Sequence, residues 1–390
     1  MKNKYFPFLA FLVLYAAVTF SVWKKYEWNP ASMIHFGAEF AVKNASRMPE
    51  NSIVERGSAG DLGAGYDGQI FYFYSRTISE LSWDWPKGFD ESYRAPRIGY
   101  PFLIGLFGFA GKKAAVFGMY FWNISLFILS VFALRSMLNE KHRYLSWFYI
   151  LSPFSLGSYS VLVSDSVMTS LVIIAYYFFV TGRNIPFILT ASLSILTKEP
   201  SLFLYFPLGL EALQKKDWKK TALTASILII PAAWQIYLRA TFPNWSASRL
   251  ADFVTFFDGI IQYGSQLSQN FSLSNLKETA RLLSRLPLFA LLVTGVYVVF
   301  TGNIRRGWVF RLGLGLDFIM IASASFYHFW SVYENISRMF TVSIPMMIFL
   351  QQEDEESNTK PYLYMCALIL ILFLIKTLFI QKTQDYLIWK

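Results

Sequence analysis

Side chains able to bind or polarise a substrate gather in a few short polar stretches of this chain. The first stretch is Tyr66-Asp67-Gly68-Gln69, preceded by Gly65 and followed by four aromatic residues. Glycines on both sides let the Asp67 carboxylate project from a tight turn, with the backbone close to a ligand. An ordinary Asp-Gly turn at the protein surface is the alternative. The aromatic run would lay the turn against a membrane, which favours a functional site.

Basic residues suited to a phosphate group lie in later stretches. Arg94 and Arg97 stand just before an apolar stretch that starts near Gly99, where lipid headgroups would lie. Guanidinium groups bind phosphate oxygens through paired hydrogen bonds, so these two residues predict a phosphate clamp. Anchoring of the chain at the membrane interface is the alternative. Lys198 and Arg338, each next to an apolar segment, are further candidate phosphate ligands.

Three more polar residues belong to the same set of candidates. Asp165 lies between two serines at a turn, where it either faces a ligand or caps the next helix. Glu199 follows Lys198 and is expected to hold a hydroxyl group, with a surface ion pair as the alternative. His328 lies in the polar stretch before Arg338. The three histidines of the chain show no metal-ligand spacing, so a bound zinc ion is not expected.

The chain that positions these side chains has the composition of a membrane protein. Of its 390 residues, 55% are hydrophobic and 15% are charged, against about 25% charged in soluble domains. The basic residues behind the net charge of +10 lie largely beside apolar segments, where they set topology and indicate no nucleic-acid partner. We therefore predict an all-α polytopic membrane protein. About eleven transmembrane helices are expected, at 5–23, 114–134, 145–162, 167–181, 185–197, 201–213, 221–240, 287–300, 309–326, 340–350 and 361–380.

Short basic loops place the N-terminus inside the cell. The segment 24–113 then forms a long first extracytoplasmic loop with juxtamembrane helices, and 241–286 forms a second one. The stretch 99–111 is too short to span the bilayer and is predicted to dip into the outer leaflet and return. All the candidate residues fall on the outer side. The chain is thus expected to be a single transmembrane domain, 1–390, whose chemistry faces the exterior.

The order of these stretches resembles the GT-C superfamily of membrane glycosyltransferases, most of all its bacterial branch with a YDGQ-type first loop. The YDGQ sequence stands at 66–69, and an R-x-x-R-I-x-Y-P stretch follows at 94–101. The resemblance covers about residues 1–350, with a layout similar to lipid A aminoarabinose transferases and protein O-mannosyltransferases. Further matches are S-P-F at 152–154, the acidic Asp165, the T-K-E turn at 197–199 and Arg338.

The resemblance implies an inverting glycosyltransferase on the outer face of a cell membrane, by this branch a bacterial cytoplasmic membrane. The implied donor is a polyprenyl phosphate-linked sugar, and the implied acceptor is a cell-surface glycan or glycolipid. Asp67 would be the general base that activates an acceptor hydroxyl. The donor phosphate would be bound by Arg94, Arg97, Lys198 and Arg338. Substrate or acceptor binding would fall to Tyr66, Gln69, Asp165, Glu199 and His328.

The chain departs from the family pattern at three positions. Asp165 stands where relatives often have Glu, and Lys198 stands where many have Arg. A second acidic residue beside Asp67, common in other branches, is absent here. These departures leave a divalent metal open as a cofactor, and no other cofactor is implied.

Two other classes of function use the same outer residues. A transporter or flippase for lipid-linked sugars would also need a charged pathway through the apolar segments, where Asp317 is the clearest candidate. A non-catalytic subunit of an envelope glycopolymer assembly complex would keep the fold around an inactive site. The scarcity of charges within the predicted spans disfavours transport.

Overall fold

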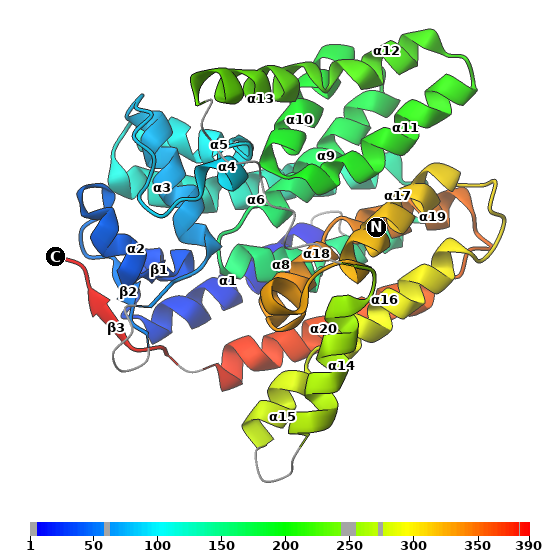
Figure 1. Ribbon diagram of the computed structural model, residues 1–390. Coiled ribbons are helices and arrows are strands. Elements are labelled where there is room, and N and C mark those ends of the chain that lie inside the picture. Colours follow the sequence, from blue (N-terminus) through cyan, green and yellow to red (C-terminus); the bar gives the residue numbers. More distant parts are fainter. Residues whose placement is uncertain (1–5, 58–62, 243–254, 272–275, 382) are drawn as a thin grey trace.

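Helices make up most of the chain. The computed structural model describes residues 6–57, 63–242, 255–271, 276–381 and 383–390. The helices form a bundle, from which α14 (Asp258–Asn270) and α15 (Leu276–Leu283) project (Figure 1). The predicted helical fold class is therefore confirmed.

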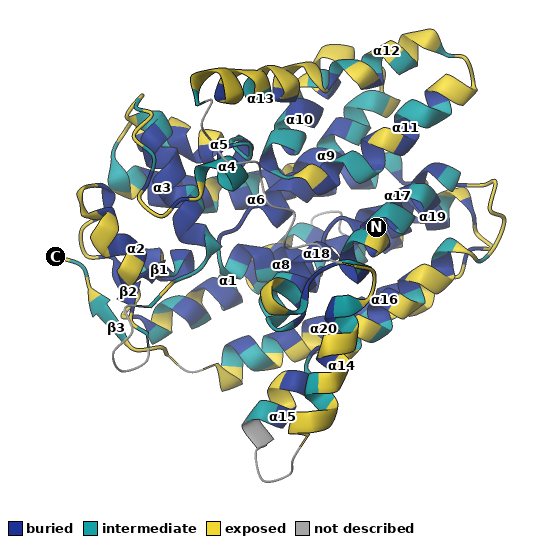
Figure 2. Ribbon diagram, viewed as in Figure 1, coloured by how far each residue is buried: buried dark blue, intermediate teal, exposed yellow. Residues whose placement is uncertain are grey.

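Five helical stretches are long and apolar enough to cross a membrane in the part of the chain that the structure describes. They are α1 (Phe6–Lys25), α6 (Lys112–Met137), α12 with α13 (Trp218–Thr241), the end of α15 with α16 (Glu278–Val299), and α20 with the π-helical turn after it (Lys360–Ile380). Many of their large apolar side chains are exposed, as expected for contact with lipid: Figure 2 shows long exposed faces on α13, α16 and α20. This pattern is compatible with a membrane protein.

The remaining predicted spans are shorter helices, so the count of eleven is not confirmed. Segment 145–162 is broken in two because Pro153 begins a new helix. The other segments are helical over most of their predicted length. Segment 145–162 forms α7 (Ser146–Ile150) and α8 (Pro153–Ser160). The other segments form α9 (Asp165–Val180), α10 (Asn184–Thr197), α11 (Leu202–Gln214), α17 (Trp308–Ala322) and α19 (Ser343–Glu353).

Helix α5 (Gly99–Gly108) forms the short apolar stretch that sequence analysis predicted to be re-entrant. Its 10 residues rise about 15 Å, half the thickness of a bilayer core. Helix α5 packs between α3 (Asp67–Ser79) and α6 and reaches α10. The contact with α10 depends on Gly99, where an added Cβ would lie 2.4 Å from Thr197 Oγ1.

The polar segment between α1 and α5 contains a small mixed sheet with helices around it. Strand β2 (Ile53–Glu55) pairs in parallel with β1 (Phe36–Gly37) and antiparallel with β3 (Tyr386–Ile388). The chain thus returns at its C-terminal end to the polar segment near its start (Figure 1). The sequence did not predict this sheet, because its strands are two or three residues long and β3 lies far away in sequence. Short helices here are α2 (Ala38–Lys43), α3 and α4 (Glu91–Arg94), with 3-10 turns at Pro30–Ile34 and Ala45–Arg47.

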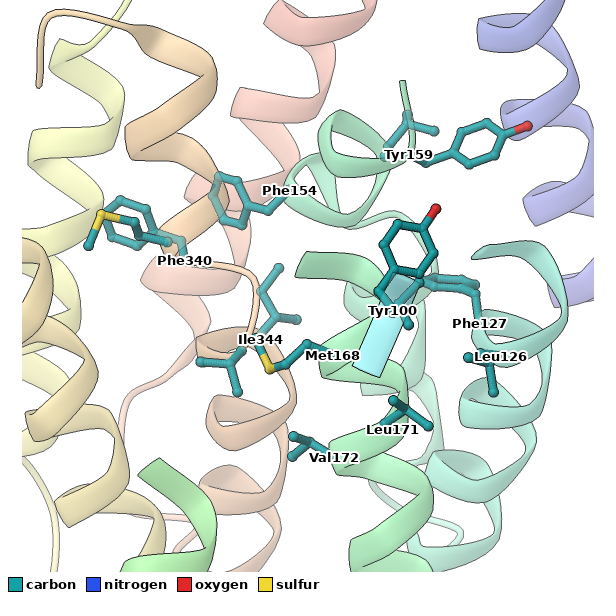
Figure 3. Close-up of a cluster of buried hydrophobic side chains, with 14 of the residues drawn as sticks. Tyr100, Leu126, Phe127, Phe154, Tyr159, Met168, Leu171, Val172, Phe340 and Ile344 are labelled. Carbon is teal, nitrogen blue, oxygen red and sulfur yellow. The ribbon is translucent and has the colours of Figure 1, made fainter. Parts of the chain in front are cut away.

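The core lies where α5, α6, α8, α9 and α19 meet. Figure 3 shows Tyr100, Phe127, Met168, Leu171 and their neighbours packed between these helices. Helices α9 and α19 are buried along most of their length, as is more than half of α6, whereas the other four long apolar stretches are mostly accessible. The remaining elements are α18 (Tyr333–Met339), the π-helical turns Phe326–Trp330 and Lys376–Ile380, and the 3-10 turns Arg143–Leu145 and Glu199–Ser201.

Candidate active site

One cavity of about 820 Å³ gathers most of the residues singled out in the sequence. Its wall is formed by the start of α3, α4, the turn between α10 and α11, α13 and α18. Tyr66 and Gln69 lie outside this wall. Eight of the ten predicted side chains line the cavity: Asp67, Arg94, Arg97, Asp165, Lys198, Glu199, His328 and Arg338.

Asp67 is the first residue of α3 and pairs with two arginines. Arg338 Nη2 lies 3.0 Å from Asp67 Oδ2, and Arg94 Nη1 lies 3.5 Å from Asp67 Oδ1. The Asp67 side chain keeps 36% of its surface exposed, whereas the Arg338 side chain keeps 9%. The carboxylate is thus accessible from the cavity, and the guanidinium behind it is fixed in the wall.

Glycines and Gln69 hold the Asp67 turn in place. Gly65 has a φ of +67°, and an added Cβ would lie 2.4 Å from the Gly37 nitrogen. Gln69 accepts a hydrogen bond from Gly37 N at 3.0 Å and donates one to Ala64 O at 2.6 Å. The position of Gln69 therefore indicates a role in supporting the turn.

Tyr66 supports Arg338 from behind the cavity wall. Its hydroxyl donates to Asn335 Oδ1 at 2.6 Å, and Arg338 Nη2 donates to the same oxygen at 3.1 Å. The Arg338 guanidinium also lies 5.1 Å from the centre of the Tyr66 ring. These contacts orient Arg338 toward Asp67.

Asp165 and Lys198 form a second charged pair on the same wall. Asp165 is the first residue of α9, nearly fully buried, and its Oδ1 pairs closely with Lys198 Nζ. Arg338 Nη1 lies 3.7 Å from Asp165 Oδ2, so Arg338 stands between two carboxylates. The start of α9 has no side-chain cap hydrogen bond. The capping role considered for Asp165 is therefore not what the structure shows.

Glu199 pairs with Arg97, not with its neighbour Lys198. Arg97 Nε lies 3.0 Å and 3.1 Å from the two carboxylate oxygens, and the guanidinium stacks 4.4 Å from the Tyr93 ring centre. From the sequence, Lys198 and Glu199 were expected to hold a phosphate and a hydroxyl, and a surface ion pair was the alternative. The chain instead points Lys198 and Glu199 toward different partners across the cavity.

The charges lining the cavity leave a positive excess. Three carboxylates line the cavity, and with His328 neutral the net charge of its lining is +2. The five cationic side chains are those of Arg94, Arg97, Lys198, Arg239 and Arg338. Burial alone would raise the pKa of Asp67, but Arg338 and Arg94 outweigh it and hold that pKa well below its ordinary value of 3.8. Burial likewise opposes the ionisation of Glu199, whose pKa is nevertheless lowered by Arg97. Asp67 and Glu199 are therefore ionised, and the positive excess suits an anionic ligand.

Two lining residues on α13 escaped the sequence analysis. Gln235 and Arg239 stand four residues apart, so they share one face of this apolar helix. Arg239 forms no ion pair with any described residue. The sequence could have identified them, because two polar residues one helical turn apart are unusual within a predicted span such as 221–240.

No protein-family model, curated protein or solved structure matches the chain.

The function of the cavity must therefore follow from its geometry and charge. Within the described ranges, no three His, Cys, Asp or Glu side chains form a group that would hold a metal ion. What the cavity offers is an exposed carboxylate, cations around it, and a wall of apolar side chains. The apolar part includes Ile70, Phe71, Met168, Leu202 and Phe203.

Proposed function

We propose that this chain is a membrane glycosyltransferase that uses a polyprenyl phosphate-linked sugar as donor. Its acceptor would be a hydroxyl of a cell-surface glycan or glycolipid, on the outer face of the membrane. The observation that carries the proposal is the placement of Asp67 against Arg94 and Arg338, within one cavity whose net charge is positive. An acid–base group, phosphate ligands and an apolar wall are the parts that this reaction needs.

The donor would bind through its phosphate and its lipid chain. The cations supply charge-assisted hydrogen bonds to phosphate oxygens, and the apolar wall suits the start of an isoprenoid chain. Arg94 lies 28% exposed, so it is accessible to a phosphate group. No nucleotide is needed for this chemistry, because the lipid phosphate is itself the leaving group.

Transfer would proceed in one displacement. The acceptor hydroxyl gives its proton to an oxygen of Asp67, and its oxygen forms a bond to the anomeric carbon of the sugar. The bond between that carbon and the phosphate oxygen breaks, and its electron pair leaves with the polyprenyl phosphate. Arg94, Arg97, Lys198 and Arg338 would stabilise the charge that develops on the leaving oxygen. Attack from the opposite face inverts the anomeric centre.

The same arginines would control the basicity of Asp67. They hold its pKa low, so the carboxylate is ionised but a weak base. A phosphate bound to Arg94 and Arg338 would share their charge and raise the pKa of Asp67. The carboxylate would thus become a stronger base once the donor is in place, which matches base strength to the reaction.

Within the described part of the chain, Asp317, the candidate residue for a transport pathway, has no ion pairs like those around Asp67. Asp317 is fully buried in α17, and neither of its carboxylate oxygens has a hydrogen-bond partner among the described residues. It does not line the cavity. Its neighbours in α17 are apolar, and Lys198, which lines the cavity, acts on it electrostatically. Transport would need further charged groups that continue this path through the span.

Mass spectrometry of surface glycans tests the proposal. Cells lacking the protein would be complemented with the wild type, with Asp67→Asn, or with Asp84→Asn as a control. Asp84 is an exposed acid in the same polar segment, with 86% of its side-chain surface accessible. We expect a sugar increment with the wild type and Asp84→Asn but not with Asp67→Asn. Identical glycans in all four strains would contradict the proposal.

A further inference from the structure

A group of stacked aromatic rings lies where α13 meets the loop that follows α3. We call Trp83, Trp234 and Tyr237 the aromatic shelf. The ring centre of Trp83 lies 5.9 Å from that of Trp234 and 5.8 Å from that of Tyr237. Trp234 and Tyr237 stack on each other at 5.5 Å with 21° between their planes. Trp83 and Tyr237 remain 42% and 40% exposed, so the shelf presents open ring surface.

The aromatic shelf continues into the candidate active site. Trp83 packs on Trp85 at 5.6 Å, and Trp85 in turn packs on Phe89 at 5.7 Å and Phe242 at 5.6 Å. Phe89 and Phe242 line the cavity that holds Asp67. Trp234 lies four residues before the lining residue Leu238, hence on the same face of α13. The shelf therefore borders the cavity, and packed rings connect the two.

The Trp234 side of the shelf faces the polar segment. The exposed apolar residues Ile229 and Ile236 lie on other faces of the helix, with 65% and 69% exposure, whereas Ile230, 40% exposed, lies four residues before Trp234 on the same face. Trp234 instead turns toward the polar segment, where its Nε1 donates to Ala95 O at 3.0 Å. Tyr74 donates to the same oxygen at 2.8 Å. The shelf is thus held at the end of α4, through the shared acceptor Ala95 O.

We propose that the aromatic shelf is the docking site for the glycan part of the acceptor. The apolar face of a pyranose ring, with its C–H bonds, stacks on indole and phenol rings, while its hydroxyls stay in water. Rings that are already packed against one another lose little conformational freedom on binding. Gln235 and Arg239 line the cavity from the same helix and can hydrogen-bond hydroxyls of the residue that enters it. The assignment rests on the proposed transferase function and names its acceptor class as a polyhydroxylated sugar chain, not a bare lipid.

Direct binding tests this assignment without requiring turnover. Oligosaccharides released from the envelope of cells that make the protein would be titrated against the purified full chain in detergent by saturation-transfer NMR. We expect saturable binding of at least one fraction. Trp83→Ala should weaken this binding by at least about tenfold, the effect of losing one well-packed aromatic contact. Trp83→Phe should bind within about threefold of the wild type, because it keeps a ring.

Two further variants test whether the loss of glycan affinity is specific to residues of the shelf. Tyr237→Ala should weaken binding as Trp83→Ala does. Trp28→Ala is the matched control: Trp28 is 58% exposed in the same polar segment but pairs with Phe20, away from the cavity. Its glycan affinity should equal that of the wild type. Melting temperatures of all variants would show that they are folded.

The outcomes separate this assignment from the transferase proposal. Glycan binding that depends on Trp83, in a protein that transfers no sugar, would remove the transferase function and leave the docking site. Unchanged affinity in Trp83→Ala and Tyr237→Ala would overturn the docking site and indicate aromatic anchoring at the membrane interface. Failure of the wild type to bind any released fraction would overturn it as well.

Discussion

At the scale of single residues, the central feature is Arg338 between Asp67 and Asp165. One guanidinium contacts two carboxylates that come from α3 and α9. Such sharing offsets the repulsion between two carboxylates that lie close together. A phosphate that bound to Arg338 would meet a guanidinium group that the two carboxylates already hold in position. The catalytic geometry would then exist before the donor arrives.

Replacing Arg338 tests its role toward the donor phosphate. We expect Arg338→Ala to lower kcat/KM for the donor by about a hundredfold, since a preorganised cation at the leaving oxygen is lost. Arg338→Lys should recover only part of this loss, because a point charge cannot reproduce two parallel hydrogen bonds. Donor titrations measure both. Unchanged kcat and KM in alanine variants of Arg94, Arg97, Lys198 and Arg338 would mean that these residues only anchor the chain.

Paired charges at Asp67 also predict a dependence of stability on pH. The pKa of Asp67 is lower in the folded chain than its ordinary value of 3.8. A carboxylate whose pKa is lowered by folding stabilises the folded state. This stabilisation is fully present at pH values above the ordinary pKa, and it is lost as the pH falls toward the pKa of the folded state. The wild type should therefore melt at a higher temperature than Asp67→Asn at pH 7, and the gap should narrow below about pH 4. A gap that stays constant from pH 7 to pH 3 would show that the pairs do not stabilise the fold.

The sequence picked out eight residues that line the candidate site, but not their pairings. Asp67, Arg97 and Arg338 could be chosen because charged groups beside apolar segments are costly and need a reason. Which acid meets which base depends on how helices distant in sequence pack, and no local pattern encodes this. Arg97 therefore meets Glu199 across 102 positions. Arg239 was overlooked although it lies near the end of the predicted span 221–240, in the last turn of α13.

At the scale of elements, the sequence predicted helices well and their boundaries less well. Apolar segments such as 114–134 and 361–380 are helical as expected, because their composition allows no other structure in lipid. Segment 145–162 is divided at Pro153 into two short helices, since proline favours the first turn of a new helix. Helix α5 is short as predicted, and its position between α3 and α10 comes from close packing at glycine.

Gly99 allows a prediction about that packing. An added Cβ would lie 2.4 Å from Thr197 Oγ1 and 2.7 Å from Leu193 O, so α5 and α10 would have to separate. Gly99→Ala should destabilise the fold by about 1–3 kcal/mol. Thermal unfolding in detergent measures the change. Gly264→Ala on α14 is the control, because no atom lies within 4 Å of its added Cβ. Equal melting temperatures for Gly99→Ala and the wild type would show that this contact is not tight.

At the scale of the whole molecule, the arrangement in the membrane remains a prediction with a direct test. Ser166 and Gly307 would serve as labelling sites from sequence alone, but both are buried. Ser268 on α14 and Ile304 between α16 and α17 are exposed, and the sole cysteine, Cys366, is buried. We expect an impermeant thiol reagent added outside intact cells to label Ser268→Cys and not Ile304→Cys. Labelling of both, or of Ile304→Cys alone, would overturn the topology.

The most direct test of the account is the turnover of Asp67→Asn. The purified chain in lipid nanodiscs would receive a polyprenyl phosphate-linked sugar and released envelope glycans, and sugar transfer would be followed by mass spectrometry. Asparagine keeps the shape of the side chain but cannot accept the proton, so turnover should fall at least about a hundredfold. Asp84→Asn should retain the wild-type rate. A rate for Asp67→Asn close to that of the wild type would contradict a transferase built around this carboxylate.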